Sequence, residues 1–327
     1  MAAEIELKLF IQKQDHDLLV KILDSLPRSS PQRHIKLTNG YFDTHDLQLR
    51  RWDMGLRVRG FDEQLEQTIK TAGSVVGGIH SRPEYNVSID QKRPNLSLFP
   101  NEIWPVGYNI NEVNSALECI FETNFNRQTW HINTQDSIVE VALDIGEIVA
   151  NGKNEPICEL EFELLSGQAS SLLPLAIEVA KSVPVRLGKA SKAQRGYQLA
   201  GKSPAVATSP LDKMPTQDVN QNKETIKHTL ANALECWQLI EQRLAVSSLT
   251  QQAPLWVQLL ECIELVKSSL TQLHHSDNQL DTLVNPVLAA VKNAAAASTS
   301  SSLPVLWRQP QYGQLQLAIV AMLYQFH

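Results

Sequence analysis

Polar and apolar residues alternate strictly at the start of the chain. Glu4, Glu6 and Lys8 occupy every second position, and isoleucine and leucine residues lie between them. Alternation of this kind over a short segment predicts a β-strand with one polar and one apolar face. The polar face of a strand usually contacts water, so the question is whether these charges do so or line a site.

Short strands of the same kind are predicted throughout the first 200 residues. They are rich in β-branched and aromatic residues, are bounded by turn residues, and lie at 37–44, 55–61, 63–73, 82–89, 127–134, 137–149 and 157–167. Helices are predicted between and after them, at 15–26, 111–121, 170–183 and 191–201, the first with Asp15 as its N-cap. This part of the chain is therefore predicted to be α+β, with many antiparallel strands and helices outside them.

The pattern changes after residue 200. Residues 201–222 contain three prolines and almost no large apolar residues, which is typical of a linker. Beyond them, helical spacing predicts helices at 222–246, 254–275, 281–297 and 312–326, with a loop in the alanine- and serine-rich run 294–302. We therefore predict an α+β domain over 1–200, a linker over 201–222 and an all-α bundle over 223–327.

Composition narrows the class of protein. The 327 residues are 43% hydrophobic and 20% charged, as in a globular protein, and the net charge of −6 argues against non-specific nucleic-acid binding. No apolar run approaches the roughly 20 residues that a membrane-spanning helix needs, and the N-terminus lacks a signal-peptide pattern. The four cysteines show no metal-ligand spacing. We therefore expect a cytoplasmic protein with reduced thiols and neither a nucleic-acid nor a membrane partner.

Six of the predicted strands, including the first, carry charges on one face only. In the others the residues that share a face are Arg57 with Arg59, Glu66 with Lys70, Arg82 with Glu84, Glu140 with Asp144, and Glu159 with Glu161 and Glu163. An open sheet with helices on its apolar face would give the same pattern, with every charge in water. However, cations concentrate in the middle strands and carboxylates in the first and last. Like charges on one face also repel each other unless a cation lies between them.

If the sheet closes into a barrel, the charged faces can point inward. Such an interior cannot be a dry core, because unpaired buried charges are energetically costly. It would be a wet, ligand-filled tunnel. Cations on one side and carboxylates on the other suit a polyanion that a divalent metal bridges to the carboxylates, such as a phosphate chain with Mg²⁺.

The ordered motifs resemble those of the CYTH superfamily, the triphosphate tunnel metalloenzymes. The family's N-terminal E-x-E-x-K is similar to Glu4, Glu6 and Lys8. Its later elements resemble, in chain order, YFDT at 41–44, Arg57, Arg59, Lys70, Arg82 with Glu84, Arg127, Asp144, ELEFE at 159–163, and Ser191-Lys192. The resemblance covers about residues 2–200.

The resemblance implies an eight-stranded antiparallel barrel with outer helices, a divalent cation and hydrolysis of a triphosphate. The sequence looks most like the bacterial inorganic triphosphatases, many of which carry a histidine- and arginine-rich helical CHAD domain as their second half. Here the tail after residue 222 is only about 105 residues long and lacks an H-x-x-R motif followed by an arginine cluster. We therefore expect a shortened or diverged CHAD-like bundle.

The resemblance also implies roles for the charged residues. The phosphate oxygens would be held by Lys8, Arg57, Arg59, Lys70 and Arg82, with Lys192 and Arg127 closing the cage. The Mg²⁺ or Mn²⁺ ligands would be Glu4, Glu6, Asp144, Glu159 and Glu161, with Glu163 as a further member at the tunnel mouth. Which carboxylate acts as base is open. The dispersed histidines His34, His45, His80 and His131 are interpreted as surface or hydrogen-bonded residues.

Three alternatives to an inorganic triphosphatase have the same charge pattern. Two are enzymes of the same fold, acting on thiamine triphosphate or on a nucleoside triphosphate, the latter including class IV adenylyl cyclases. The third is a binding module that senses polyphosphate or triphosphate without turnover. A metal-free binder would need only the cations, so the presence of both charged sets favours metal-dependent hydrolysis of inorganic triphosphate to diphosphate and phosphate.

Overall fold

The computed structural model describes residues 3–27, 32–76, 79–203, 223–273, 278–297 and 299–325. Its strands are β1 (Ala3–Phe10), β2 (Arg33–Thr44), β3 (Gly55–Phe61), β4 (Gln64–Lys70), β5 (Ser74–Val76), β6 (Ile79–Ile89), β7 (Leu117–Asn133), β8 (Ile138–Ala150), β9 (Lys153–Ser166) and β10 (Arg186–Leu187). Its α-helices are α1 (His16–Ser25), α2 (Gln48–Arg51), α3 (Ile110–Ser115), α4 (Leu172–Ser182), α5 (Lys192–Leu199), α6 (Lys223–Val246), α7 (Leu249–Leu273), α8 (Asn278–Ala297), α9 (Ser302–Trp307) and α10 (Pro310–Gln325).

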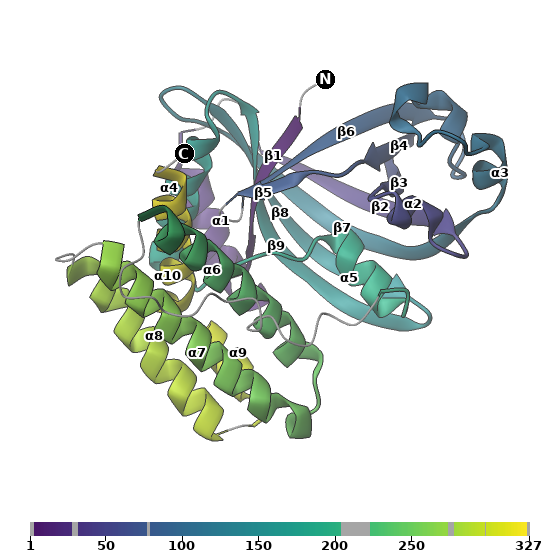
Figure 1. The fold of residues 1–327 in the computed structure, drawn as a ribbon. Helices are drawn as coiled ribbons and strands as arrows, with labels where there is room; N and C mark the ends of the chain where they lie inside the picture. Colours follow the sequence, from purple (N-terminus) through teal and green to yellow (C-terminus); the bar gives the residue numbers. More distant parts are fainter. Residues whose placement is uncertain are drawn as a thin grey trace.

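The main sheet closes into a barrel (Figure 1). Neighbouring strands follow the order β1-β9-β8-β7-β2-β3-β4-β6, and β6 pairs back with β1, where Glu4 lies opposite Arg82. Every pairing is antiparallel. Short β10 and β5 extend the sheet beside β1 and β6. The predicted α+β fold with an eight-stranded antiparallel barrel is confirmed.

On β1 the apolar residues lie outside the barrel and the charged residues inside. On β1, Leu7 and Leu9 are fully buried in a hydrophobic core that also contains residues of α1 and α4. Lys8, which lies between them, is also buried and forms an ion pair with Glu161 on the facing side of β9. The helices that cover the outer face therefore remove the apolar side of the strands from water, and the polar side is left to line the interior.

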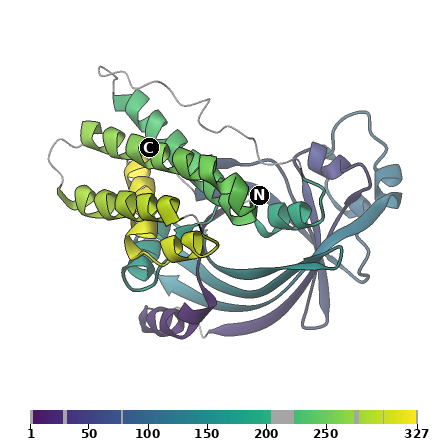
Figure 2. The same ribbon diagram turned by 90° about the horizontal axis from the view of Figure 1, so that it is seen from below.

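The C-terminal helices α6–α10 pack onto the same hydrophobic core at one end of the barrel (Figure 2). Helix α10 contacts both α4 and β10, and Trp237 of α6 donates a hydrogen bond of 2.6 Å from Nε1 to the hydroxyl of Tyr312. The core is therefore continuous from the outer face of the barrel into the tail. No described helix is both long and apolar enough to cross a membrane. The three-part division of the chain stays a prediction, and residues 204–222 of the predicted linker lie outside the described residues.

Helix α5 packs against aromatic residues on strands β2 and β7. A second hydrophobic cluster joins Tyr197 of α5 to Tyr41, Phe121 and Phe125 of the strands. Tyr41 stacks on Phe121 with ring centroids 4.5 Å apart, and Tyr197 meets Phe121 edge-on at 5.2 Å. Phe121 and Phe125 lie on the same face of β7 as Arg127, so this cluster belongs to the interior side of the sheet.

The YFDT segment anchors this helix. Asp43 is fully buried and accepts hydrogen bonds of 2.8 Å from the backbone N–H groups of Thr44 and Leu49 and one of 3.1 Å from the Tyr197 hydroxyl. Burial raises the pKa of Asp43, and these donors offset part of that shift. Asp43 of this motif therefore helps to hold α5 in place and does not line the charged part of the barrel.

Three local predictions need correction. The helix predicted at 111–121 ends at Ser115, because residues from Leu117 onward pair with β2 and begin the long strand β7. The predicted loop at 294–302 begins too early, since α8 continues to Ala297 through a run of alanines, the best helix formers. Asp15 precedes α1 as expected, yet its side chain pairs with Arg308 and does not cap the helix.

We predict that Gly196→Ala destabilises the protein. A Cβ at this position would lie 2.1 Å from the ring of Phe121, which is held against Tyr41 and cannot move aside. The free energy of unfolding should fall by about 1–3 kcal/mol, as for other overpacked core sites. Denaturant unfolding would measure it, with Gly55→Ala as control, because a Cβ at Gly55 meets nothing within 4 Å. Equal stability of the two variants would contradict the packing of α5 inside the barrel.

Candidate active site in the barrel interior

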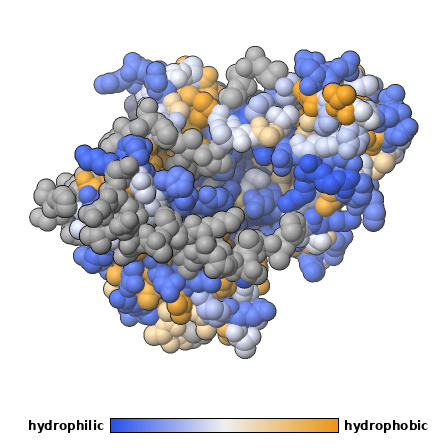
Figure 3. Space-filling view, in the orientation of Figure 1, coloured by the Kyte–Doolittle hydropathy of each residue, from blue (hydrophilic) through white to orange (hydrophobic). Residues whose placement is uncertain are grey.

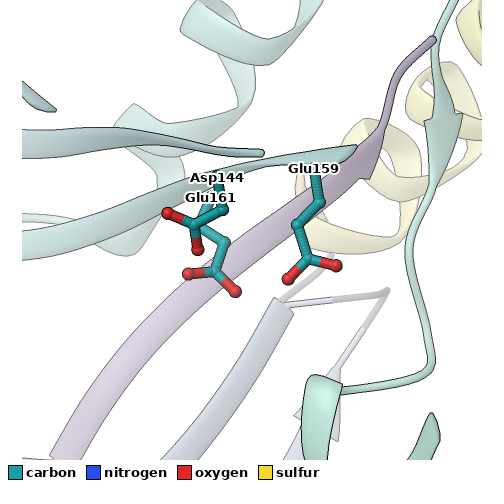
Figure 4. A group of neighbouring side chains, drawn as sticks. All are labelled: Asp144, Glu159 and Glu161. Carbon is teal, nitrogen blue, oxygen red and sulfur yellow. The ribbon is translucent and has the colours of Figure 1, made fainter. Parts of the chain in front are cut away.

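Strands β8 and β9 bring three carboxylates together inside the barrel. Asp144 lies opposite Glu159 in the register, and Glu161 follows two residues later on the same face of β9. One oxygen of each lies within 4.8 Å of the others, and Figure 4 shows the three side chains pointing to the same side of the sheet. Asp144 and Glu159 are 0% exposed, so their charges need partners within the protein.

The partners of these carboxylates come from α5, β7 and β1. Lys192 Nζ lies 2.7 Å from Asp144 Oδ2 and 3.0 Å from Glu161 Oε1, and it also contacts Glu159. Arg127 binds Asp144 through Nε and Nη2, at 2.7 and 2.6 Å, and reaches Glu161 at 2.7 Å. We call these five residues the inner ion cluster.

Two further cations border the inner ion cluster. Lys8 Nζ lies 3.3 Å from Glu161, and Arg195 Nη1 donates to Glu159 at 3.1 Å. Burial opposes ionisation of Asp144, but Arg127 and Lys192 outweigh it and hold the pKa of Asp144 below its ordinary value. The pKa of Glu161 is lowered in the same way. Asp144 and Glu161 therefore remain charged at neutral pH.

A second acidic group lies further along the interior, on β1 and β9. Glu6 is opposite Glu163 in the register, and Glu4 precedes Glu6 by two residues on β1. Burial and the negative charges of Glu4 and Glu140 raise the pKa of Glu163 to about 7. Burial also raises the pKa of Glu4, although Lys70 contacts its carboxylate. We call Glu4, Glu6 and Glu163 the outer carboxylates. The six predicted metal ligands thus separate into this group and the three carboxylates of the inner ion cluster.

The arginines of β3 lie beside these groups with few counter-charges. Arg57 Nη2 donates to Thr68 at 3.1 Å and lies 3.9 Å from Glu84, while its buried Nε has no hydrogen-bond partner in the described part of the chain. Arg59 Nε donates to the Asn39 side chain at 2.9 Å, and Arg59 makes no ion pair with any described carboxylate. Burial and the positive charges of Arg57 and Arg127 lower the pKa of Arg59 to about 9. This pair is therefore short of negative charge.

The remaining predicted cations lie on β4 and β6. Lys70 contacts Glu4 and lies 2.9 Å from Glu84, so Glu84 is held by Lys70 as well as by the more distant Arg57. Arg82 lies opposite Glu4 across β1 and β6 but forms no ion pair within residues 3–27, 32–76, 79–203 and the described tail. Hydrophilic residues line the hollowed centre of the face in Figure 3, over the barrel strands.

Two further residues line the interior: Arg195, which the sequence did not single out, and His80, which was interpreted as a surface or hydrogen-bonded residue. Arg195 follows Lys192 by three positions on α5, a spacing that places both on one helix face and could have indicated it. His80 lies opposite Glu6 in the register, two residues before Arg82 on β6, so the same strand alternation identifies it. Burial, together with the positive charge of nearby Lys8, lowers the pKa of His80 to about 4, which leaves its imidazole neutral at physiological pH.

Comparison with known proteins assigns the family. The sequence model of the CYTH domain matches residues 2–197. The chain belongs to the CYTH family. The predicted resemblance is therefore confirmed, and the charged interior described above is that of a CYTH domain.

Relatives of this CYTH protein include the inorganic triphosphatase of Haemophilus influenzae, which is 38% identical over 209 residues. These residues are 62% of this chain and 56% of that protein, so the chain matches only about half of its relative's length. Solved structures to which the chain is similar include a Hippeastrum protein (19% identity, TM-score 0.46, 62% of this chain and 98% of that chain). Another is the PH1819 protein of Pyrococcus horikoshii (15% identity, TM-score 0.40, 60% and 98%).

We predict that Glu163 makes the metal-free protein less stable as the pH rises. Because its pKa is raised from 4.5 to about 7 on folding, the folded protein binds more protons than the unfolded chain between these values. Stability from this group is full below pH 4.5 and is lost as the pH rises through 7. Melting temperatures in EDTA between pH 5 and about pH 8 should therefore fall more for the wild type than for Glu163→Gln.

A matched control for this measurement is Glu178→Gln, since Glu178 is exposed on α4 and, among the described residues, pairs only with Lys181 one turn further on. Its melting profile should follow that of the wild type. Parallel profiles for the wild type and Glu163→Gln would show that Glu163 is not crowded by the other carboxylates.

Proposed function

We propose that the barrel interior binds inorganic triphosphate with Mg²⁺ or Mn²⁺ and hydrolyses it to diphosphate and phosphate. The observation that carries this proposal is the shortage of negative charge around Arg57 and Arg59. A buried guanidinium nitrogen without a partner and a depressed arginine pKa are both costly unless an anion binds there. The name of the relative from Haemophilus influenzae supports inorganic triphosphate as that anion.

The other predicted cations would complete the anion site. Lys8, Arg127 and Lys192 contact carboxylates of the inner ion cluster, so each could exchange one such contact for a phosphate oxygen. Lys70 and Arg82 lie toward Glu4, where they would hold the other end of the chain. Arginine suits this role because its planar guanidinium binds two phosphate oxygens at once.

The acidic residues fit a divalent cation. All six are carboxylates, and oxygen-only donor sets suit Mg²⁺ and Mn²⁺. The three of the inner ion cluster already surround the ammonium group of Lys192, so this position favours a cation. The outer carboxylates carry an excess of negative charge, seen in the raised pKa of Glu4 and Glu163. When bound, the metal would neutralise phosphate oxygens and act as a Lewis acid.

Hydrolysis would then depend on position and electrostatics. In phosphoryl transfer the charge spreads over the oxygens of the transferred group, and fixed cations stabilise it without reorganising. Arg57 and Arg59 would hold those oxygens. The outer carboxylates would accept hydrogen bonds from the attacking water and so orient it.

We predict phosphate release from inorganic triphosphate that requires Mg²⁺ or Mn²⁺ and stops in EDTA. Both Arg57→Ala and Glu6→Gln should lower kcat/KM by about 100-fold or more, since each removes a charge that acts on the transferred group. Release would be measured with inorganic triphosphate, ATP and thiamine triphosphate in parallel. Stronger release from one of the latter two would assign the enzyme to that substrate.

Matched controls are Arg51→Ala and Glu178→Gln, because these charges pair with Asp46 and Lys181 outside the barrel. Their kcat/KM should equal that of the wild type. No release from any substrate, with inorganic triphosphate still raising the melting temperature, would make the protein a binding module and overturn the proposal.

A further inference from the structure

Strand β10 is an edge strand whose outward backbone groups contact the C-terminal helices. On its inner side Gly188 N–H donates to the carbonyl of Lys8 at 2.8 Å. On its outer side the N–H of Leu187 donates to Gln316 Oε1 at 2.8 Å, and the carbonyl of Leu187 accepts from Gln238 Nε2 at 3.3 Å. Two side-chain amides from α10 and α6 thus take the place of a neighbouring strand, which buried edge groups require.

The C-terminal helices also contact the residues on either side of Leu187. The backbone of α10 approaches so closely at Gly313 that an added Cβ would lie 2.0 Å from the carbonyl oxygen of Val185. Arg186 lies with its guanidinium 3.7 Å from the ring centroid of Trp307 in α9. Lys189 Nζ pairs with Glu235 of α6 at 2.7 Å. Residues 185–189 are therefore fixed by the tail along their whole length.

Residues 185–189 lie next to two cations of the barrel interior, Lys8 in space and Lys192 along the chain. Gly188 lies against Lys8, where a Cβ would come within 2.8 Å of the Lys8 side chain. Ser191 follows shortly afterwards and caps α5 by accepting a hydrogen bond from Gln194 N–H at 3.1 Å. This cap sets the position of Lys192, the first residue of the helix. Both lysines contact Glu161, so their positions are coupled.

We propose that Gln238 and Gln316 are positioning residues for the tunnel. Through Leu187 these two amides fix β10 and the start of α5, and so hold Lys8 and Lys192 at the anion site. The C-terminal helices then contribute to the geometry of the anion site and do not act as an independent domain. The identity of the anion rests on the proposed function, whereas the positioning itself rests on the contacts of Leu187.

The test replaces both amides with apolar side chains of similar size, as Gln238→Leu with Gln316→Leu. The backbone groups of Leu187 would then be buried without partners, and the segment should shift or open to reach water. A misplacement of a catalytic group by about 1 Å can cost up to 100-fold, so we expect roughly tenfold loss from this indirect change.

Gln252→Leu is the matched control. Gln252 is likewise buried in the tail and donates 3.1 Å hydrogen bonds to the carbonyls of Leu244 and Ser247, far along the chain from Leu187. It should lower the melting temperature as the double variant does, without touching the tunnel. Comparison of the two separates loss of position from loss of stability.

Three measurements follow on the full chain, well below the melting temperature. Hydrogen exchange, followed by mass spectrometry, should speed up in residues 186–192 of the double variant alone. Calorimetry in EDTA should give a Kd for inorganic triphosphate raised roughly tenfold, and steady-state assays with Mg²⁺ should give kcat/KM lowered by a similar factor. Unchanged exchange and Kd in the double variant would overturn the proposal.

A double-mutant cycle adds a readout that a purely structural role would not move. In a Lys192→Ala background the amide substitutions should lower kcat/KM by a smaller factor than in the wild type, because one of the two lysines that they position is gone. Equal losses in both backgrounds would overturn the proposal. If the wild type releases no phosphate, the proposed function fails, while the exchange and binding comparisons still decide whether the amides position the segment.

Discussion

The structure depends on charge that is buried inside the barrel and paired there. Asp144 and Glu159 are fully buried, and each would be strongly destabilising without the ammonium and guanidinium groups of Lys192 and Arg127. These partners come from different elements, α5 and β7. The strands can therefore close around their polar faces only when α5 is in place, where Tyr197 and its aromatic neighbours hold it.

The outer helices follow from the same constraint. A strand that turns its charges inward must turn Leu7, Leu9 and their equivalents outward, and these residues need cover. Helices α1 and α4 supply part of it, and α6–α10 extend the same core. Inside, the charge balance is uneven. Lys8 and Arg195 add positive charge to the inner ion cluster, whereas the outer carboxylates and the β3 arginines have few counter-charges. Negative charge is in excess at the outer carboxylates and positive charge at the β3 arginines. A divalent cation would balance the former, and a phosphate chain the latter.

Much of the arrangement of charged residues on the strands can be predicted from local sequence patterns. Strand alternation has a period of two, so the common face of Arg57 with Arg59, or of Glu159 with Glu161, can be predicted without the fold. The division of the six carboxylates into two groups could not be predicted, because it depends on register between strands. Glu163 meets Glu6 of β1, while Glu159 meets Asp144 of β8. Only the paired strands determine which residue faces which.

The contacts between the tail and β10 could not be predicted either, because they join residues far apart in the sequence. Leu187 and Gln316 are 129 positions apart, and no local pattern links them. A signal nevertheless exists in the helices. Gln238, Glu241 and Gln316 lie among the apolar residues of α6 and α10 and are almost fully buried. A polar side chain on the apolar face of a helix is costly unless a partner meets it. Each therefore indicates a hydrogen bond to another element: Gln238 and Gln316 bind the edge of β10, and Glu241 accepts from Trp307 at 3.0 Å.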